Sequence, residues 1–311
     1  MRRPLLLVLA AISLLAGCSL PPPDGDAPLR YRDQVFPTVS VTRDLTYGSA
    51  PDAQGNAVAL KLDLYEPSGD PVAQRPALVW VHGGGFTAGS KSSGAAISTY
   101  YARMGYVAVS IDYRLLSPTG CGGNPDPTPV CEAAALGAQH DAQAAVRWLR
   151  RHAATYRVDP DRIAMGGGSA GAVTSLLAAW RSEDPGTSGN PGFSSAIRGA
   201  VSVSGGIPTD EYIGAGDAAV LFIHGTADQT VPYNWAVSNA ARMFNLGLPV
   251  VLESLDGAGH GLAGPYRDLI QQQSSYFLYG MLDLARAGGQ PTSAARAFDR
   301  QVRRLRARHG G

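Results

Sequence analysis

The sequence has no excess of charge of one sign and no hydrophobic run long enough to cross a membrane. Its 311 residues carry 26 Lys and Arg against 25 Asp and Glu, which gives a formal net charge of +1. A general nucleic-acid surface is therefore not indicated, because such surfaces carry a clear excess of positive charge. The apolar stretch at residues 5–15 is shorter than the roughly 20 residues that a membrane-spanning helix needs. The sequence also contains no internal repeat.

The N-terminal residues have the pattern of an export signal. Met1-Arg2-Arg3 is positively charged, and the apolar stretch after it ends in Leu15-Ala16-Gly17-Cys18. These four residues resemble the bacterial lipoprotein box, in which the cysteine is lipidated and becomes the mature N-terminus. We therefore expect residues 1–17 to be a signal peptide and Cys18 to be acylated. The exported protein would then be lipid-anchored to the bacterial cell envelope, on its periplasmic or cell-surface face. An ordinary signal peptide with an incidental cysteine is the alternative.

The segments that flank the central part of the chain differ from it in composition. Residues 18–37 are rich in proline and polar residues, so we expect a semi-extended tether that holds the globular part off the membrane. Residues 288–311 form a basic tail with six arginines. A solvated, frayed helix and a segment attracted to anionic lipid are both compatible with this tail. Residues 38–287 remain, and their number suits one α/β domain with a sizeable core.

The sequence has only three cysteines. The expected export of the protein indicates what each of them does. With Cys18 used for lipid, Cys121 and Cys131 are left as an even pair in an oxidising compartment. The residues between them are rich in glycine and proline and have no periodicity. A zinc site is not indicated, since two cysteines need further ligands and no histidine is near them in the sequence. We predict a disulfide that closes this loop.

The hydrophobic pattern of the central part alternates between strands and helices. Residues 39–47 and 57–65 suit two antiparallel strands that are joined by the turn at 51–56. Continuous apolar runs, typical of strands buried on both faces, follow at 77–81, 107–111, around 163, and at 199–204, 219–223 and 249–255. Helices are expected over 140–156, 172–180 and 266–285, with a further helix ending near residue 104. This order predicts an α/β fold with a mostly parallel central sheet and helices on both faces, whose ligands bind at the carboxyl ends of the strands.

Residues 167–171, Gly-Gly-Ser-Ala-Gly, fit the pattern G-x-S-x-G between a strand and a helix. A serine on such a sharp turn needs strained dihedrals and small neighbours, so that the helix and the strand can approach. The turn would expose the hydroxyl of Ser169 at the sheet edge. His82-Gly83-Gly84-Gly85, Asp228 and His260 also come directly after strands. The fold is therefore able to bring them to the same edge as Ser169.

These motifs together resemble the α/β-hydrolase superfamily, and within it the serine esterases and lipases that carry His-Gly-Gly-Gly near the front. The resemblance covers about residues 39–285. It rests on five motifs in the family's order: His82 to Phe86, Asp112-Tyr113-Arg114, Gly167 to Gly171, His224 to Asp228, and Gly259-His260-Gly261. The implied activity is carboxylic ester hydrolysis, with no metal and no organic cofactor.

The resemblance implies a role for each site residue. Ser169 would be the nucleophile, His260 its general base, and Asp228 the carboxylate that orients His260. Asp256 is a rival carboxylate on the histidine's own loop. The backbone N–H groups of Gly84, Gly85 and Ala170 would form the oxyanion hole, which stabilises the negative charge that develops on the substrate.

The remaining motif residues are expected to be structural or to line the substrate site. We interpret Asp112 and Arg114 as an ion pair or loop clamp. Four aromatic residues are candidates for an acyl pocket and equally for plain core: Phe86, Tyr113, Trp180 and Tyr212.

Two departures from the family pattern bear on the substrate. Gly168 stands where many relatives have Asp or Glu, which the proposed triad does not need. The connection at 205–218 is short where lipases with lids carry a cap subdomain. This predicts an open cleft with a minimal cap, suited to short-chain esters or to an ester that projects from a larger molecule. Residues 115–135 and 181–197 are the segments available to cover the site.

Several functions compete for this fold. Plain carboxylesterase activity comes first, and removal of acetyl or feruloyl groups from polysaccharide follows. A peptidase of the prolyl-oligopeptidase type shares motifs like residues 224–228, but such enzymes carry a large β-propeller for which this chain has no room. A non-catalytic, membrane-tethered binding protein with this fold is the alternative from another class. The expected partners are a small-molecule or polymer-borne ester and, through the lipid, a membrane.

Overall fold

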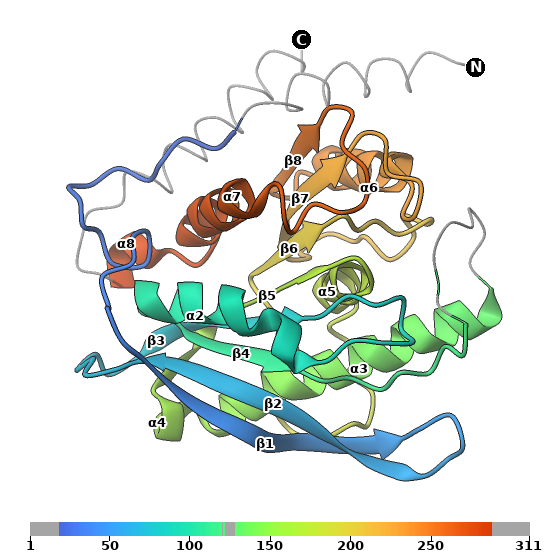
Figure 1. Cartoon of the computed structure of the whole chain (residues 1–311), viewed down its shortest axis with the longest axis horizontal. Helices are drawn as coiled ribbons and strands as arrows, with labels where there is room; N and C mark the ends of the chain where they lie inside the picture. Colours follow the sequence, from blue (N-terminus) through green and yellow to red (C-terminus); the bar gives the residue numbers. More distant parts are fainter. Residues whose placement is uncertain (1–18, 120, 122–127, 288–311) are drawn as a thin grey trace.

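One eight-stranded sheet forms the centre of the computed structural model, which describes residues 19–119, 121 and 128–287 (Figure 1). The strands follow one another across the sheet in the order β1-β2-β4-β3-β5-β6-β7-β8. Their bounds are β1 Val39–Pro51, β2 Ala57–Pro67, β3 Arg75–Val81, β4 Val107–Ile111, β5 Val158–Gly168, β6 Gly199–Val203, β7 Ala219–Gly225 and β8 Val250–Leu255. This sheet is the central sheet that the predicted α/β fold requires, and that prediction is confirmed.

The sheet is parallel except at the β1 edge. The strand β2 pairs antiparallel with both β1 and β4, and all the other neighbouring pairs are parallel. At the centre, Val79 of β3 lies in register with Val109 of β4 and Met165 of β5. These side chains are fully buried, as expected for apolar strands that are covered on both faces.

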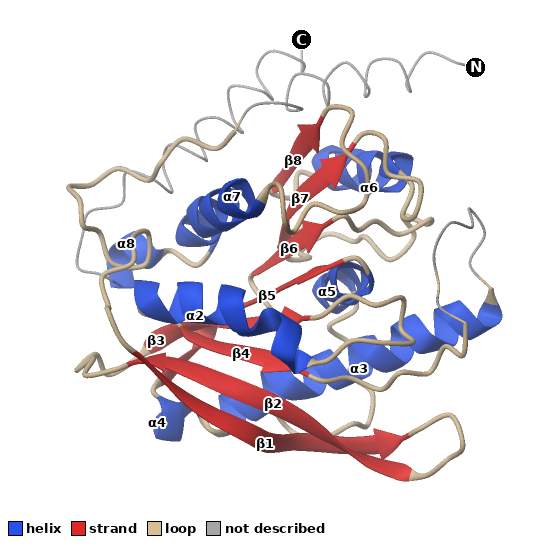
Figure 2. Cartoon of the chain, viewed as in Figure 1, coloured by secondary structure: helices blue, strands red, loops and turns tan. Residues whose placement is uncertain are grey.

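Helices cover both faces of the sheet (Figure 2). Buried residues of α3 (Pro129–Arg151), α5 (Ala170–Trp180) and α6 (Tyr233–Asn245) share one core cluster, and those of α2 (Ala95–Met104) and α7 (Arg267–Met281) share the other. The short elements are η1 Lys91–Gly94, α4 Ala153–Tyr156 and α8 Leu284–Ala287. Within the described ranges, no helix combines the length and apolar character that crossing a bilayer requires.

Helix α3 begins earlier than the sequence pattern predicts. It starts at Pro129 rather than near His140, so that Cys131 lies in its first turn. The hydroxyl oxygen of Thr128 accepts a hydrogen bond from the backbone N–H of Cys131, and Pro129 occupies the first helical position. A capping threonine followed by proline is a helix start signal, although it lies in a stretch that otherwise has the composition of a loop.

Residues 19–37 pack against the domain, which corrects the expectation of an extended tether. The side chains of Leu29 and Tyr31 are buried, and the N–H of Tyr31 donates to the carbonyl of Met104 at 2.9 Å. Further along the surface, the N–H of Leu20 donates to Gln273 of α7 at 2.6 Å. The apolar side chains of this segment outweigh its polar composition. The predictions for residues 1–17, Cys18 and the tail at 288–311 lie outside the described residues.

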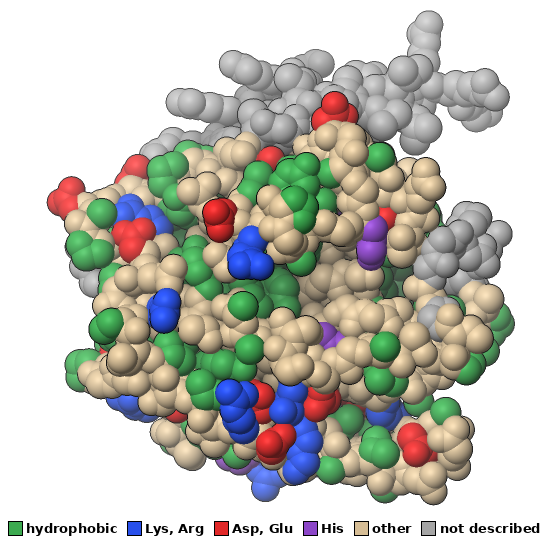
Figure 3. Space-filling model, viewed as in Figure 1, with side chains coloured by type: hydrophobic (Ala, Val, Ile, Leu, Met, Phe, Trp, Pro, Cys, Tyr) green, Lys and Arg blue, Asp and Glu red, His purple; other side chains and the backbone are tan. Residues whose placement is uncertain are grey.

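Charged side chains of both signs gather over β1 and β2 on the face shown in Figure 3. The Nζ of Lys91 lies 3.0 Å from a carboxylate oxygen of Asp44 and 2.9 Å from one of Asp63. Asp63 is buried, and Arg43 lies 3.3 Å from its other oxygen. The pairing keeps this surface close to neutral, in keeping with the small net charge of the chain.

Candidate active site

Ser169 lies on the sharp turn between β5 and α5. Its backbone has φ 54° and ψ −120°, and its N–H donates to the carbonyl of Val203 at 2.9 Å. A Cβ atom at Gly167 would lie 2.5 Å from the backbone of Gly171, and one at Gly171 would lie 2.1 Å from the carbonyl oxygen of Val81. Both positions therefore require glycine, because the helix and the strands meet too closely for any side chain. The turn leaves Ser169 partly exposed.

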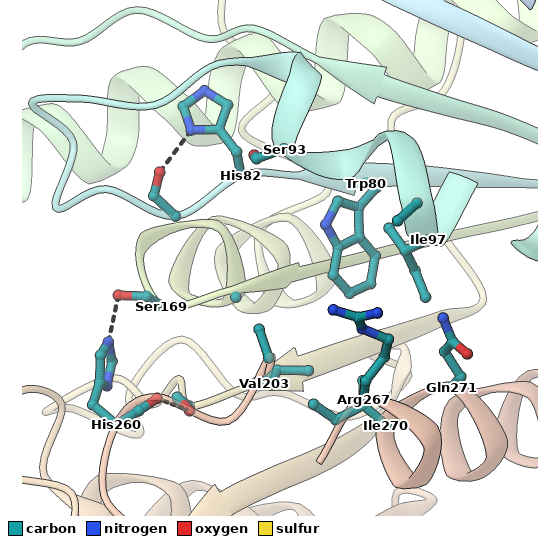
Figure 4. Close-up of a pocket in the computed structure, with 15 residues that line it drawn as sticks. Trp80, His82, Ser93, Ile97, Ser169, Val203, His260, Arg267, Ile270 and Gln271 are labelled. Atoms are coloured by element: carbon teal, nitrogen blue, oxygen red, sulfur yellow. Dashed lines mark hydrogen bonds between the residues drawn. The ribbon is translucent and has the colours of Figure 1, made fainter. Parts of the chain in front are cut away.

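The structure brings Ser169, His260 and Asp228 together, although they are far apart in the sequence. Figure 4 shows the first two of them. The Nε2 of His260 lies 2.8 Å from the Oγ of Ser169, and its Nδ1 lies 2.8 Å from the Oδ2 of Asp228. The loop that carries the histidine is held by Ser204, whose hydroxyl donates to the carbonyl of His260 at 2.9 Å. Asp256, the rival carboxylate, is exposed and accepts a hydrogen bond from Thr226 instead.

Asp228 is buried and accepts hydrogen bonds at both of its carboxylate oxygens. Its Oδ1 accepts from the backbone N–H groups of Thr230 at 2.9 Å and Val231 at 3.0 Å. Its Oδ2 lies 3.1 Å from the Nε2 of His224 in addition to its contact with His260. Burial alone would raise the pKa of Asp228, but the donors on both oxygens outweigh it and hold the pKa well below its usual value. No separate role was predicted for His224, although it begins the motif that ends in Asp228.

The glycine loop after β3 lies against the Ser169 turn. Gly84 and Gly85 have φ of 120° and 61°, and a Cβ at Gly84 would lie 2.1 Å from the carbonyl oxygen of Ala88. The carbonyl of Gly85 accepts a hydrogen bond from the N–H of Cys121 at 3.0 Å. In the described part of the chain, no hydrogen bond engages the N–H groups of Gly84, Gly85 or Ala170. These donors are thus available to a bound group.

Tyr113 and His82 hold the start of this loop. The two rings stack with centroids 4.3 Å apart, and the hydroxyl of Tyr113 donates to the carbonyl of His82 at 3.0 Å. The Nδ1 of His82 lies 2.7 Å from the carbonyl oxygen of Gly83, and burial lowers the pKa of this histidine. A neutral, fixed His82 therefore supports the backbone of the loop.

The residues on either side of Tyr113 act as loop clamps and do not pair with each other. The Nε of Arg114 lies 2.9 Å from Asp141 of α3, whose carboxylate is buried. Asp112 accepts a hydrogen bond from the N–H of Lys91 at 2.7 Å. Of the two alternatives, the loop clamp is confirmed and the ion pair between Asp112 and Arg114 is wrong, because each side chain faces a different neighbouring segment.

A cavity of about 430 Å³ opens beside the Ser169 hydroxyl. Ser169 and His260 lie at one end, and the walls come mainly from β3, α2 and α7: Trp80, Ile97, Val203, Arg267, Ile270 and Gln271 (Figure 4). None of these wall residues was a candidate from the sequence. The position of Trp80 could have indicated that it lines the site. It lies two residues before His82, and alternate residues of an extended chain point to the same side.

A second cavity of about 320 Å³ lies beneath the disulfide between Cys121 and Cys131, which the structure contains as predicted. Of the four aromatic candidates, Phe86 and Tyr212 line this cavity, whereas Trp180 and Tyr113 are buried in the core. The described residues between 115 and 135 thus contribute walls to it. Over the residues that the structure describes, no group of three or more His, Cys, Asp and Glu side chains is placed to hold a metal ion.

Two family profiles match adjoining parts of the chain. One is described as BD-FAE and matches residues 62–203, and the other is described as TAP-like protein and matches residues 199–287. Together the matches run from β2 to the end of α8. They include Ser169 in the first part, and Asp228 and His260 in the second.

Known proteins that resemble this chain include esterases. The probable carboxylic ester hydrolase LipM of Mycobacterium tuberculosis is 33% identical over 155 residues, which cover 49% of this chain and 31% of that protein. Esterase LipQ of the same organism is 33% identical over 159 residues, covering 50% of this chain and 32% of that protein. The chain thus spans about a third of the length of these curated relatives.

Solved structures cover much more of the chain. The native form of Est2, a thermophilic esterase from the planctomycete Thermogutta terrifontis, has a TM-score of 0.63 and 26% identity, and the match covers 86% of this chain and 98% of that chain. The butyrate-bound form of the same enzyme has a TM-score of 0.63 and 25% identity, covering 80% of this chain and 96% of that chain.

Proposed function

We propose that the chain is an α/β-hydrolase related to the carboxylesterases that it resembles, and that it hydrolyses carboxylic esters by means of Ser169. The observation that carries the proposal is the continuous hydrogen-bonded chain from Ser169 through His260 to Asp228. A serine hydroxyl becomes an effective nucleophile at neutral pH only when a base is within hydrogen-bond reach. Such an arrangement beside a cavity is suited to acyl transfer.

The proposed reaction passes through an acyl-enzyme. The Oγ of Ser169 attacks the ester carbonyl while the Nε2 of His260 takes its proton, and Asp228 stabilises the imidazolium that forms. The oxyanion would accept hydrogen bonds from the free N–H groups of the glycine loop and Ala170. His260 then gives this proton to the departing alcohol. In the second half, His260 takes a proton from water while the water attacks the acyl carbon, and it returns that proton to the Oγ of Ser169 as the acid leaves.

A short or projecting acyl group is the substrate that the surroundings of Ser169 favour. The connection between β6 and β7 is short, and the cavity beside Ser169 has a volume of about 430 Å³. The solved Thermogutta esterase has been obtained with propionate and with butyrate bound. We therefore propose short-chain esters or carbohydrate-linked acyl esters. A prolyl-oligopeptidase-like peptidase and a non-catalytic binding protein remain the alternatives to test.

The test is hydrolysis of p-nitrophenyl esters from acetate to palmitate, together with labelling by a fluorophosphonate probe. Ser169→Ala should abolish both turnover and labelling, whereas Ser40→Ala, which changes an exposed serine on β1, should preserve both. Turnover that favours long chains would contradict the open cleft. Folded protein that neither turns over an ester nor reacts with the probe would point to the binding protein, and cleavage of prolyl peptides alone would point to the peptidase.

We also propose that the protein is exported and held to the cell envelope by lipid on Cys18. The proposal rests on the charged residues 1–3, the apolar residues 5–15 and the four-residue motif that ends in Cys18. The full-length protein should partition into the detergent phase of a phase-separating detergent, and Cys18→Ser should partition into water. Equal partition of the two proteins would favour an ordinary signal peptide.

A further inference from the structure

The cavity beside Ser169 has a polar end that faces away from the nucleophile. Arg267 and Gln271 are four residues apart on α7 and so lie on the same side of that helix. Figure 4 shows both side chains entering the cavity from α7, with Trp80 and Ile97 on the opposite wall. Ser169 lies at the other end of the same cavity. A substrate held at Ser169 can therefore extend one of its arms toward Arg267.

Arg267 has no acidic partner in the described part of the chain. No hydrogen bond or ion pair with a described residue engages its guanidinium, and none of the residues that line the cavity is Asp or Glu. The neighbouring Asp268 is exposed and does not line the cavity. Several other described arginines are paired with a carboxylate, for example Arg114 with Asp141. Arg267 thus presents a free planar cation with several N–H donors to the cavity.

The walls between the two ends are apolar. Val203 lies between Ser169 and Arg267, Ile270 lies beside Arg267, and Trp80 and Ile97 are on the opposite wall (Figure 4). In the space-filling view, hydrophobic side chains fill the depression between α2 and α7 on this face (Figure 3). A chain of methylene groups or a ring would bury its surface here. A group placed next to Arg267 would need to accept hydrogen bonds, since a guanidinium and an amide N–H₂ donate.

We propose that Arg267, assisted by Gln271, is a specificity-determining residue that selects esters whose arm is apolar in the middle and ends in a carboxylate. The proposal rests on the proposed ester hydrolysis at Ser169. The arginine and the carboxylate would form a charge-assisted pair at the far end of the cavity. The enzyme would then act on half-esters of dicarboxylic acids, or on acyl esters of hydroxy acids, depending on which arm enters.

The test compares matched carboxylates and carboxamides. Monomethyl esters of dicarboxylic acids from succinate to suberate probe the acyl arm, and ω-acetoxy carboxylic acids of similar length probe the alcohol arm, each beside its terminal amide. We expect one series to have an optimal length at which kcat/KM of the carboxylate exceeds that of the amide by about tenfold, as one charge-assisted hydrogen bond allows. The preference should fall as salt concentration rises.

Three variants make the test specific. Arg267→Gln should remove the preference by lowering kcat/KM for the carboxylates more than for the amides, and Arg267→Lys should keep part of it, since the charge remains but the planar donors are lost. Arg198→Gln, which removes an exposed charge outside the cavity, should keep the full preference. An equal preference in Arg267→Gln, or an equal loss for carboxylates and amides, would overturn the proposal.

A binding measurement separates this proposal from the proposed function. Adipate should bind to the intact protein in a calorimetric titration, and Arg267→Gln should weaken that binding by about tenfold. If no ester is hydrolysed but the effect of Arg267→Gln on adipate binding is found, the proposed function fails and the carboxylate subsite stands. If esters are hydrolysed and adipate binds both proteins equally or neither, the subsite fails.

Discussion

His224 and Asp228 form a buried contact, with the Nε2 of the histidine 3.1 Å from the Oδ2 of the aspartate. The same Oδ2 accepts a hydrogen bond from His260, and the same Nε2 lies 3.0 Å from the carbonyl oxygen of Val231. Both neighbours of this nitrogen are acceptors, so the Nε2 of His224 carries the proton. His224 is completely buried. It therefore acts on Ser169 chemistry only by fixing the carboxylate that orients His260.

Replacing His224 tests this positioning role. His224→Leu should lower kcat by about tenfold, because Asp228 loses one charge-assisted donor and holds His260 less firmly, while KM changes little. His224→Gln should recover most of the rate, since its amide N–H₂ can occupy the place of the Nε2–H. Steady-state kinetics with a p-nitrophenyl ester provides both constants. Equal losses in the two variants would mean that His224 serves only to fill the core.

The depressed pKa of Asp228 makes the stability of the fold sensitive to acid. Hydrogen bonds to the carboxylate lower its pKa in the folded protein below the usual 3.8, so the carboxylate stabilises the fold above that value. This contribution is lost as pH falls below 3.8 toward the folded-state pKa. Between pH 5 and pH 2.5, the free energy of unfolding in urea should therefore fall more steeply for the native sequence than for Asp228→Asn. Parallel curves would contradict the prediction.

The same variant should lower kcat by roughly 10⁴.

The glycines around Ser169 differ in whether a larger side chain can replace them. Gly171→Ala should lower the free energy of unfolding by about 1–3 kcal/mol or prevent folding, because the new Cβ would meet the backbone oxygens of Val81 and His82. Gly168→Ala provides the matched control, since its Cβ would meet only the carbonyl oxygen of Val203 at 4.0 Å. Thermal unfolding of the two variants measures the difference. Similar melting temperatures would show that the helix can shift away from β3.

Removing the disulfide should affect both stability and rate. The Cys121→Ser/Cys131→Ser protein should lose about 3 kcal/mol of stability, as expected for a crosslink that closes a loop of this length. Its kcat should also fall, because the N–H of Cys121 holds the carbonyl of Gly85 in the glycine loop. Urea unfolding and ester hydrolysis measure the two effects. Reductant should reproduce them in the native sequence and have no effect on the double variant; a stable, fully active double variant would contradict both.

Much of the fold could be predicted, because its central strands are continuous apolar runs with glycine at the points of closest approach. Helix α6 was missed. Its inner face carries Ala236, Ala240 and the buried polar Asn239, which donates hydrogen bonds to the backbone at Ile207 and Thr209. With Met243, these residues recur at the i, i+3, i+4, i+7 spacing of a helix. The periodicity was therefore present, but two alanines and an asparagine make the inner face only weakly hydrophobic.

Some residues of the candidate site could be predicted from the sequence and others could not. The order of Ser169, Asp228 and His260 and the glycine loop were visible as short motifs, and the structure brings those residues together. Arg267 gave no signal, because its importance depends on which cavity the start of α7 borders. Composition also misled at residues 19–37, where two buried side chains, Leu29 and Tyr31, determine the conformation of a segment that is otherwise polar and rich in proline.

The packing of residues 19–37 limits how far the folded part can lie from the proposed lipid anchor at Cys18. The contacts of this segment extend from Tyr31 back to Leu20, which is hydrogen-bonded to α7, the helix that also carries Arg267. If Cys18 carries lipid as we propose, almost no slack separates the membrane from the body of the protein. The folded part could then move very little relative to the point where the lipid attaches it to the membrane. Its cavity would stay close to the membrane, and the proposed hydrolysis would be confined to esters that lie at, or diffuse to, that level of the cell envelope.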